Sequence, residues 1–324
     1  MSSMKAIRYR TYGSPDVLTL EDVDVPTIAD DQVLVRVVAS SVNPLDWHYV
    51  RGKPYVVRLM AGLRRPKEPG LGDDLAGVVV AVGDRVTRFV PGDEVFGMSI
   101  RCFAEFVAAN ERGLVHKPAG LSFEHAAAMG IAAITALQAV RDEGKVQADQ
   151  RVLINGASGG VGTFAVQIAN HFGADVTAVT STPNLELVRS IGAHSAIDYT
   201  TTDFTRAAER YDVILDFVGG RSLRNLRRAL SPTGRLVLCG APRGEWLGPI
   251  LSPIGAKIQS LFTKQTLGTF LATRKLADLT LLRDLAESGA ITPVIDREFA
   301  LAELPEALSY LETGRARGKV TIRL

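Results

Sequence analysis

The stretch Leu153–Gly162, with the sequence LINGASGGVG, decides how this chain folds. Apolar residues lead into a cluster of small ones, and glycines stand at positions 156, 159, 160 and 162. The segment before it, Arg151–Asn155, has the pattern of a strand, and the segment after it, Val161–Phe172, has the pattern of a helix. A turn rich in glycine is either an ordinary loop or a place where a ligand approaches the backbone closely.

The cluster matches the G-x-G-x-x-G fingerprint of dinucleotide-binding turns, which also lie between a strand and a helix. Ala157 permits the tight turn, Gly159 lets a pyrophosphate reach the backbone, and Gly162 lets the helix pack closely on the strand. Free N–H groups at the start of a helix favour a bound anion. We therefore expect this turn to hold a dinucleotide through Ala157, Ser158, Gly159, Gly160, Val161 and Gly162. A plain structural turn is the alternative.

Further strands and helices alternate after this turn. We expect strands at Asp175–Thr180, Tyr211–Asp216 and Arg235–Cys239, with helices at Leu185–Ile191 and Ser222–Leu230 between them. A helical pattern also precedes the turn, from Ser122 as N-cap to a glycine at position 144. Short strands that alternate with helices predict a parallel sheet covered on both faces.

The first 120 residues have a different pattern. Short β-rich segments such as Gln32–Ser40 and Asp74–Val82 are separated by Gly, Pro and Asp, which predicts a compact, mostly β domain. After a helix at about Leu276–Ser288, the tail has two strand-like segments, which we expect to rejoin that first domain. The prediction is an α/β protein with a β domain at 1–122 and 272–324 and a doubly wound, dinucleotide-binding domain at 123–271.

The tip of the second predicted strand bears on which dinucleotide binds. NAD sites usually have an Asp or Glu there, which accepts a hydrogen bond from the ribose 2′-hydroxyl. The tip here, residues 179–184, has the sequence VTSTPN and lacks a carboxylate. Ser181, Thr182 and Asn184 can donate to a 2′-phosphate, so the sequence favours NADPH. The same tip also lacks an Arg or Lys, and Arg189 stands further along the helix.

Composition excludes several classes of function. The 324 residues carry a net charge of +2, so no basic surface indicates a nucleic-acid partner. The two cysteines, Cys102 and Cys239, form no disulfide framework, which favours a reducing compartment and a cytoplasmic location. The N-terminus has no apolar signal core, and no long apolar run predicts a membrane span, so we expect no membrane partner.

Four segments occur in an order that resembles the medium-chain dehydrogenase/reductase superfamily. They are GLGDDLAGVVVAVGDRV from position 70, VPGDEVFG from position 90, INGASGGVG from position 154 and GKVTIRL from position 318. The chain is most similar to the zinc-free quinone oxidoreductase branch, including the reticulon-4-interacting-protein-like reductases. This resemblance implies a GroES-like β domain, a Rossmann domain, and a cleft between them for nicotinamide and substrate.

The resemblance also allows a test for zinc. Zinc alcohol dehydrogenases of the superfamily have a Cys near the position of Asn43 and a His-Glu pair in a G-H-E-x-x-G motif. Here that motif begins Gly72-Asp73-Asp74, and a zinc site needs three or four converging Cys, His or carboxylate ligands. The chain also lacks the cysteines of the structural zinc lobe. We therefore expect no metal.

Two residues of the segment 40–52 are expected to be catalytic. By the resemblance, Asn43 lies near the nicotinamide and donates to a substrate oxygen, although an Asn before Pro44 also suits a turn. His48 matches a position where relatives place a substrate-facing side chain and is a candidate proton donor. A surface histidine is the alternative, and Tyr49 is the donor if the register shifts by one residue.

The resemblance and the strand ends add further coenzyme contacts. Thr135 is expected near the nicotinamide, Tyr199 near the adenosine 2′-phosphate, and Lys319 near the coenzyme, although a solvated lysine fits the last position equally. In doubly wound folds ligands bind at the carboxyl ends of strands. The residues that follow two such ends are therefore also candidates, namely Phe217, Val218, Gly240 and Ala241.

Together these expectations describe a zinc-independent reductase that transfers hydride from NADPH to a small electrophilic acceptor, either a quinone or an α,β-unsaturated carbonyl. The runner-up is an enoyl-thioester reductase, in which the basic run Lys53–Lys67 attracts the phosphates of a carrier. A rival of a different class is a non-catalytic NADPH-binding sensor, structural or interaction protein. We expect a homodimer, because relatives often pair at the edge of the Rossmann sheet.

Overall fold

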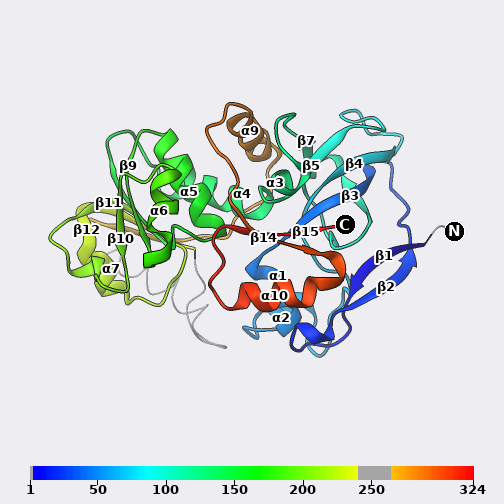
Figure 1. Ribbon diagram of the computed structural model, residues 1–324, viewed down its shortest axis with the longest axis horizontal. Helices are drawn as coiled ribbons and strands as arrows, with labels where there is room; N and C mark the ends of the chain where they lie inside the picture. Colours follow the sequence, from blue (N-terminus) through cyan, green and yellow to red (C-terminus); the bar gives the residue numbers. More distant parts are fainter. Residues whose placement is uncertain (1–2, 240–263) are drawn as a thin grey trace. The chain divides into compact units, whose positions relative to one another are not determined.

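The computed structural model describes residues 3–239 and 264–324, and the chain divides into two compact units (Figure 1). Unit 1 comprises Met1–Ile134 and Arg274–Leu324, and unit 2 comprises Thr135–Thr273. The chain thus enters unit 2 after residue 134, later than the predicted change after residue 122, and leaves it after residue 273. Residues 240 and 241, both predicted coenzyme contacts, lie outside the described part.

The main sheet of unit 1 is seven-stranded, in the order β14-β15-β3-β4-β5-β7, and β6 pairs with β3. Its strands are β3 (Gln32–Val42), β4 (Asp74–Val82), β5 (Glu94–Met98), β6 (Phe106–Asn110), β7 (Leu114–His116), β14 (Ile295–Ala300) and β15 (Lys319–Arg323). A separate antiparallel pair joins β1 (Ser3–Arg8) to β2 (Thr19–Asp24).

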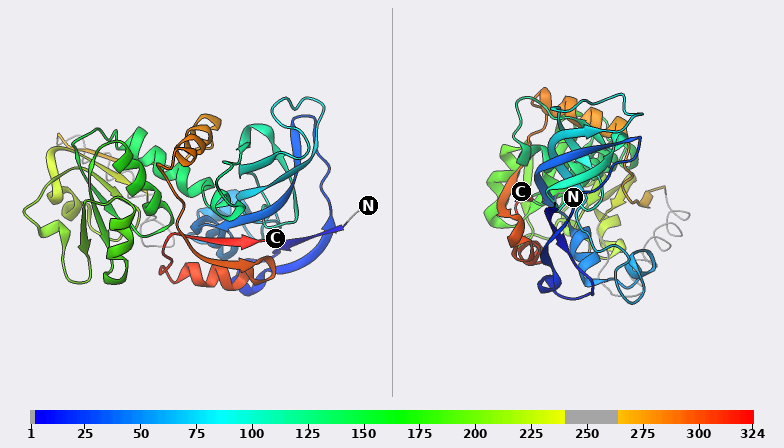
Figure 2. Two further views of the ribbon diagram at one scale, coloured as in Figure 1. Left: turned by 45° about the horizontal axis from the view of Figure 1, so that its top comes forward. Right: turned by 90° about the vertical axis from the view of Figure 1, so that its right-hand side faces the viewer.

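The last strand of the chain pairs with one of the first. β15 lies antiparallel to β3, with Val320 opposite Val42, and the left view of Figure 2 shows the red C-terminal strand within unit 1. Val42, Val320 and Ile322 are buried in a cluster that also includes Leu304 and Leu308. Since this cluster draws on both ends of the sequence, the prediction that the tail rejoins the first domain is confirmed.

Unit 1 also contains helices, some of which the mostly β prediction missed. Two lie in predicted helices, α3 (Phe123–Ala127) and α9 (Leu276–Glu287), and three were not predicted, α1 (Pro44–Arg51), α2 (Val57–Ala61) and α10 (Leu304–Glu312). α1 begins with a proline and a capping box, in which the backbone N–H of Asn43 donates to Asp46. The motif that suggested a turn is therefore the start of a helix.

Unit 2 contains a parallel six-stranded sheet in the order β10-β9-β8-β11-β12-β13. Its strands are β8 (Arg151–Asn155), β9 (Asp175–Thr180), β10 (Ser195–Asp198), β11 (Tyr211–Asp216), β12 (Leu230–Leu238) and β13 (Thr266–Thr269). Its helices are α5 (Gly160–His171), α6 (Leu185–Ser190) and α7 (Leu223–Ala229), which flank the sheet in Figure 1. The order reverses direction between β8 and β11, as in a doubly wound sheet, so the predicted fold class is confirmed.

The predicted helix between Ser122 and the glycine at position 144 is interrupted. Ser122 caps α3 as expected, but a second helix, α4 (Gly130–Gln138), starts after a break and ends in a π-helical turn at Ala139–Glu143. The break places the start of α4 against Asp74, whose Oδ1 accepts from the Ile131 N–H at 2.8 Å. Because Gly130 has no Cβ, it can approach that carboxyl group; a Cβ there would lie 2.0 Å from it.

Short 3₁₀ turns complete the described structure, at Pro15–Val17, Glu111–Gly113, Thr182–Asn184, Phe204–Arg206 and Leu301–Glu303. Among the described residues, none of the helices combines the length and apolar character needed to cross a bilayer.

Candidate functional site

The glycine turn of unit 2 lies between β8 and α5 at the carboxyl end of the parallel sheet. Gly159 is the N-cap of α5, and no side chain caps the first turn of that helix. The backbone N–H groups of the first turn therefore have no side-chain acceptor, which is the arrangement that favours an anion.

Two positions of the turn are occupied by glycine for different reasons. A Cβ on Gly162 would lie 2.1 Å from the carbonyl oxygen of Gly156, so only glycine lets α5 pack against the end of β8. A Cβ on Gly159 would meet only that same oxygen, at 3.4 Å, and Gly159 has φ −83° and ψ 175°, which any residue adopts. The fold thus requires Gly162, whereas a Cβ at Gly159 would make only an ordinary van der Waals contact with the described residues.

A hydrogen-bonded chain joins the turn to the tip of the next strand. The Ser158 hydroxyl accepts from Thr180 at 2.7 Å and from the Asn184 amide at 3.2 Å. The same amide donates to Ser181, and the buried Oδ1 of Asn184 has no hydrogen-bond partner among the described residues. A buried acceptor without a partner is costly in a protein alone, so this oxygen is suited to a ligand hydroxyl or amine.

A carboxylate that the sequence analysis missed lies at this tip. Strand β10 pairs in parallel with β9, with Asp198 beside Thr180, and Asp198 accepts from the hydroxyls of Thr182 and Thr200. These hydrogen bonds, led by that of Thr182, lower the pKa of Asp198 and keep it charged. Residues 179–184 themselves carry no carboxylate, as predicted, but the strand pairing brings one beside them from the third strand. The position of Asp198 directly before Tyr199 was the available signal.

The other predicted contacts of unit 2 lie at nearby strand ends or in α4. Tyr199 follows β10 and is 53% exposed, Val218 follows β11 and is 59% exposed, and Thr135 is buried in α4. The backbone N–H of Phe217 donates to Asn155, which places that residue beside the start of the glycine turn. The tertiary structure therefore brings the turn and the segments after β9, β10 and β11 to one edge of the sheet.

Two further polar residues at this edge were not predicted. Asp216 ends β11, and its Oδ1 accepts from the side chain of Asn155 at 2.8 Å and from the N–H groups of Val218 and Gly219. Its Oδ2 is buried and has no partner. Asp216 therefore fixes the loop after β11 and leaves one acceptor at the ligand-binding edge.

In unit 1, a buried lysine organises the segment that contains Asn43. The Lys319 ammonium, 3% exposed, donates to Asn43 Oδ1 at 2.6 Å, to the Val42 carbonyl at 3.1 Å and to Asp74 Oδ2 at 3.5 Å. Burial lowers the pKa of Lys319, while Asp74 and Asp46 oppose that effect. All three donors of the ammonium have acceptors, so this placement does not support the expectation that Lys319 reaches the coenzyme.

The lysine also fixes the amide of Asn43. An ammonium only donates, so Oδ1 of Asn43 must face Lys319 and its Nδ2 must face Asp74, at 2.8 Å. The second amide hydrogen points to the Ser41 carbonyl at 3.4 Å, and Asn43 is 2% exposed. The amide therefore has no free hydrogen for a substrate oxygen in this arrangement.

Asp74 is the acceptor at the centre of this group. Its Oδ2 also accepts from the Ser41 hydroxyl at 2.7 Å, and its Oδ1 accepts from the Ile131 N–H. Close by, burial raises the pKa of Asp46 well above its usual range, with the charge of Asp73 the next cause. Burial likewise raises the pKa of Asp73 to about 6, against the opposing effect of Arg274, which hydrogen-bonds to it.

His48 is held by its own loop. Its Nδ1 lies 2.6 Å from the carbonyl oxygen of Lys53, and because a carbonyl only accepts, the proton of the neutral ring is on Nδ1. Burial lowers the pKa of His48, so the neutral ring is favoured and its Nε2 is an acceptor. This geometry does not support His48 as a proton donor. Burial, followed by the charge of Asp73, raises the pKa of Tyr49, so its phenol keeps its proton.

The residues at the positions of the superfamily's zinc ligands do not fit a zinc ion. Asp73 is paired with the Arg274 guanidinium, and Asn43 and Asp74 face the Lys319 ammonium. Cations of the protein itself thus occupy the space next to these oxygens, and a divalent cation would be repelled. Within residues 3–239 and 264–324, no three His, Cys, Asp or Glu side chains gather in a way that could hold a metal ion.

Comparison with known families and proteins agrees with this architecture. The profile described as "Alcohol dehydrogenase GroES-like domain" matches residues 29–134, where unit 1 gives way to unit 2, and the profile described as "Zinc-binding dehydrogenase" matches residues 191–322. The chain is 37% identical to the 2-methylene-furan-3-one reductase of Solanum lycopersicum over 336 residues, which cover 99% of this chain and 79% of the relative. The chain belongs to the medium-chain dehydrogenase/reductase superfamily.

Other members support the same assignment. The chain is 35% identical to an NADPH-dependent alkenal/one oxidoreductase of Arabidopsis thaliana, covering 98% of this chain and 79% of the relative. A solved structure of the quinone oxidoreductase from Coxiella burnetii aligns over 100% of both chains with a TM-score of 0.88 and 29% identity.

The buried ion pair yields a stability prediction. Lys319→Met leaves the carboxylate of Asp74 without its ammonium, so we expect the free energy of unfolding in urea to fall by about 3–5 kcal/mol. The double variant Lys319→Met/Asp74→Asn removes both charges and should recover part of this loss. Equal stability of Lys319→Met and the unmodified protein would contradict the ion-pair interpretation.

Proposed function

We propose that this protein is an NADPH-dependent reductase that transfers hydride to a quinone or to an α,β-unsaturated carbonyl compound. The observation that carries the proposal is the uncapped start of α5 at the carboxyl end of β8, where a Cβ on Gly159 would meet no close contact among the described residues. Membership of the superfamily and the reductase names of its relatives supply the reaction class.

The protein would hold the coenzyme at the edge of the unit 2 sheet. The glycine turn would bind the pyrophosphate through backbone N–H groups. The unpartnered Oδ1 of Asn184 would accept a hydrogen bond from the adenosine part of NADPH. Ser181, Thr182 and Tyr199 lie around the carboxyl end of β9 and would contact the ribose phosphate. Phe217 and Val218, together with Thr135, would line the path toward the nicotinamide.

We propose that the reaction proceeds without zinc. NADPH, when bound, supplies the hydride, and an acceptor that is already polarised needs less electrophilic help than an alcohol substrate. The side-chain oxygens of Asn43 and Asp74 face the Lys319 ammonium instead of a metal ion. Their role is then to hold the end of β3 and the start of α1 in a fixed position.

The proton for the reduced acceptor would come from solvent or from Tyr49. Both hydrogens of the Asn43 amide and the ring proton of neutral His48 are already donated within unit 1. Tyr49 keeps its phenolic proton and lies on α1, next to His48. Asn43 and His48 are thus proposed as positioning residues.

We also propose a homodimer in a reducing, cytoplasmic compartment. β13 is the last strand of the unit 2 sheet, and edge strands are suited to pairing with a second copy. Cys102 and Cys239 are both free thiols, which suits a reducing environment.

An acceptor panel tests the proposed reaction. With NADPH present, we expect phenanthrenequinone or cyclohexenone to cause loss of the reduced-nicotinamide absorbance, faster than crotonyl-CoA does. Preferential use of crotonyl-CoA would instead identify an enoyl-thioester reductase. NADPH binding without consumption of any acceptor would support the non-catalytic alternative.

A matched pair of glycine substitutions tests where the coenzyme binds. The Cβ of Gly159→Val would meet no close contact among the described residues, so the thermal midpoint should hold while NADPH affinity, measured by calorimetry, falls more than about tenfold. Gly162→Ala places a Cβ against the Gly156 carbonyl, so the thermal midpoint itself should fall. Retention of NADPH affinity by Gly159→Val would refute the placement of the pyrophosphate.

The carboxylate of Asp198 yields a selectivity prediction. Asp198→Asn removes a negative charge beside Thr182, so the ratio of kcat/KM for NADPH to that for NADH should rise by about fivefold. Glu186→Gln removes an acid from the exposed start of α6 and serves as the control, with little change expected. A fall in the ratio for Asp198→Asn would show that Asp198 does not face the 2′-phosphate.

A further inference from the structure

The segment that follows α1 in unit 1 presents large apolar side chains to solvent. Leu59 is 67% exposed, Met60 is 78% exposed and Leu63 is 68% exposed, and the three lie within five consecutive residues. Other large apolar residues of comparable exposure, such as Val90 and Ile100, are scattered singly along the chain. Scattered exposure is ordinary for a soluble protein, whereas a contiguous group marks a contact surface.

The same segment is rich in positive charge. Positions 47–67 contain six Lys or Arg and no Asp or Glu, although the whole chain has a net charge of only +2. Arg64, Arg65 and Lys67 are exposed, and none has an ion-pair partner in the described part of the chain. We call these three cations with Leu59, Met60 and Leu63 the basic–apolar tip.

Contacts of Arg58 and Tyr12 within unit 1 hold the basic–apolar tip in place. The Arg58 side chain donates to the Gly52 carbonyl at 3.0 Å, and its guanidinium stacks on Tyr12, 4.5 Å from the ring centroid. The Tyr12 hydroxyl donates to the carbonyl of Gly62. In Figure 1, α2 lies at the margin of unit 1, next to α1. The inward side chains thus contact the rest of unit 1, whereas Leu59, Met60 and Leu63 remain exposed in the part of the chain that the structure describes.

We propose that the basic–apolar tip is a peripheral binding surface for a lipid bilayer that carries anionic headgroups. Leu59, Met60 and Leu63 enter the boundary between headgroups and acyl chains, while Arg64, Arg65 and Lys67 remain at the level of the phosphates. Charge complementarity selects this occupant, because cations next to exposed apolar side chains match an anionic interface. This surface departs from the sequence-based expectation of no membrane partner, which rested on the lack of a spanning segment.

Vesicle sedimentation tests the proposal with the full chain. The protein should sediment with phosphatidylcholine vesicles that contain about one third phosphatidylglycerol, and much less with pure phosphatidylcholine. Binding should weaken as salt is added, because screening acts on the headgroup contacts. Leu59→Ser/Met60→Ser/Leu63→Ser and Arg64→Glu/Arg65→Glu should each lower the partition coefficient by about tenfold or more.

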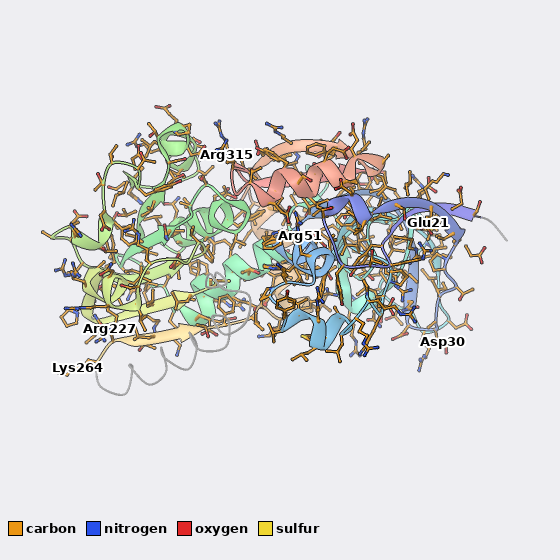
Figure 3. All side chains as sticks on the ribbon, turned by 90° about the horizontal axis from the view of Figure 1, so that it is seen from below. Glu21, Asp30, Arg51, Arg227, Lys264 and Arg315 are labelled. Carbon is orange, nitrogen blue, oxygen red and sulfur yellow. The ribbon has the colours of Figure 1, made fainter. Side chains whose placement is uncertain are left out.

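Matched controls separate this surface from general effects. Val90→Ser changes an exposed apolar residue elsewhere in unit 1 and should bind vesicles normally. Arg315→Glu/Arg317→Glu repeats the double charge reversal beyond α10; Arg315 is labelled in Figure 3, on the side of unit 1 away from α2. Normal binding by both controls would support the tip as the specific surface.

Four results would overturn the proposal. The first is equal sedimentation with neutral and anionic vesicles, and the second is an equal loss of binding in the controls. The third is unchanged vesicle binding by the serine variant together with a fall in its mass measured by light scattering, which would assign the surface to contact between copies. The fourth is unchanged vesicle binding by the arginine variant together with a raised KM for crotonyl-CoA, which would assign the cations to carrier phosphates.

Discussion

The contact between Lys319 and the Asn43–Asp74 pair is the constraint on which unit 1 depends. It joins the first residue of the last strand to the end of β3 and the start of β4, and all of its donors and acceptors are buried. Removing water from an ammonium is costly unless every N–H finds an acceptor, so the three strands are held in one register. The start of α4 adds a fourth contact to the same carboxylate.

The same contact bears on whether these positions could hold a metal ion. Where metal-dependent members of the superfamily place ligands, this chain places oxygens that face its own cations, Lys319 and Arg274. A lysine and an arginine cannot polarise a substrate alcohol as a zinc ion does, but they can fix the backbone around α1. In the proposed zinc-independent reaction, the electrophilic character would come from the acceptor itself, as in a quinone or an enone.

Unit 2 rests on a different constraint, the absence of side chains at one turn. Gly162 is required by the close approach of α5 to the Gly156 carbonyl, whereas a Cβ at Gly159 would meet no close contact among the described residues. The same edge carries buried oxygens of Asn184 and Asp216 without partners. A folded chain that leaves both space and acceptors at one edge is prepared for a ligand there.

The sequence by itself determined the alternating strands and helices of unit 2, the glycine turn and the return of the tail, because these depend on local patterns and on motif spacing. Strands β8, β9 and β11 have the predicted bounds for this reason. Only the tertiary structure decided the orientation of the Asn43 amide, the protonated nitrogen of His48 and the carboxylate that Asp198 brings to the tip of β9. The Asn43 and Asp198 features arise from contacts with residues far apart in the chain or on a neighbouring strand, and the His48 feature arises from how the loop after α1 folds back on it. In each case the direction of the hydrogen bond is set by the partner that the group meets in the folded chain.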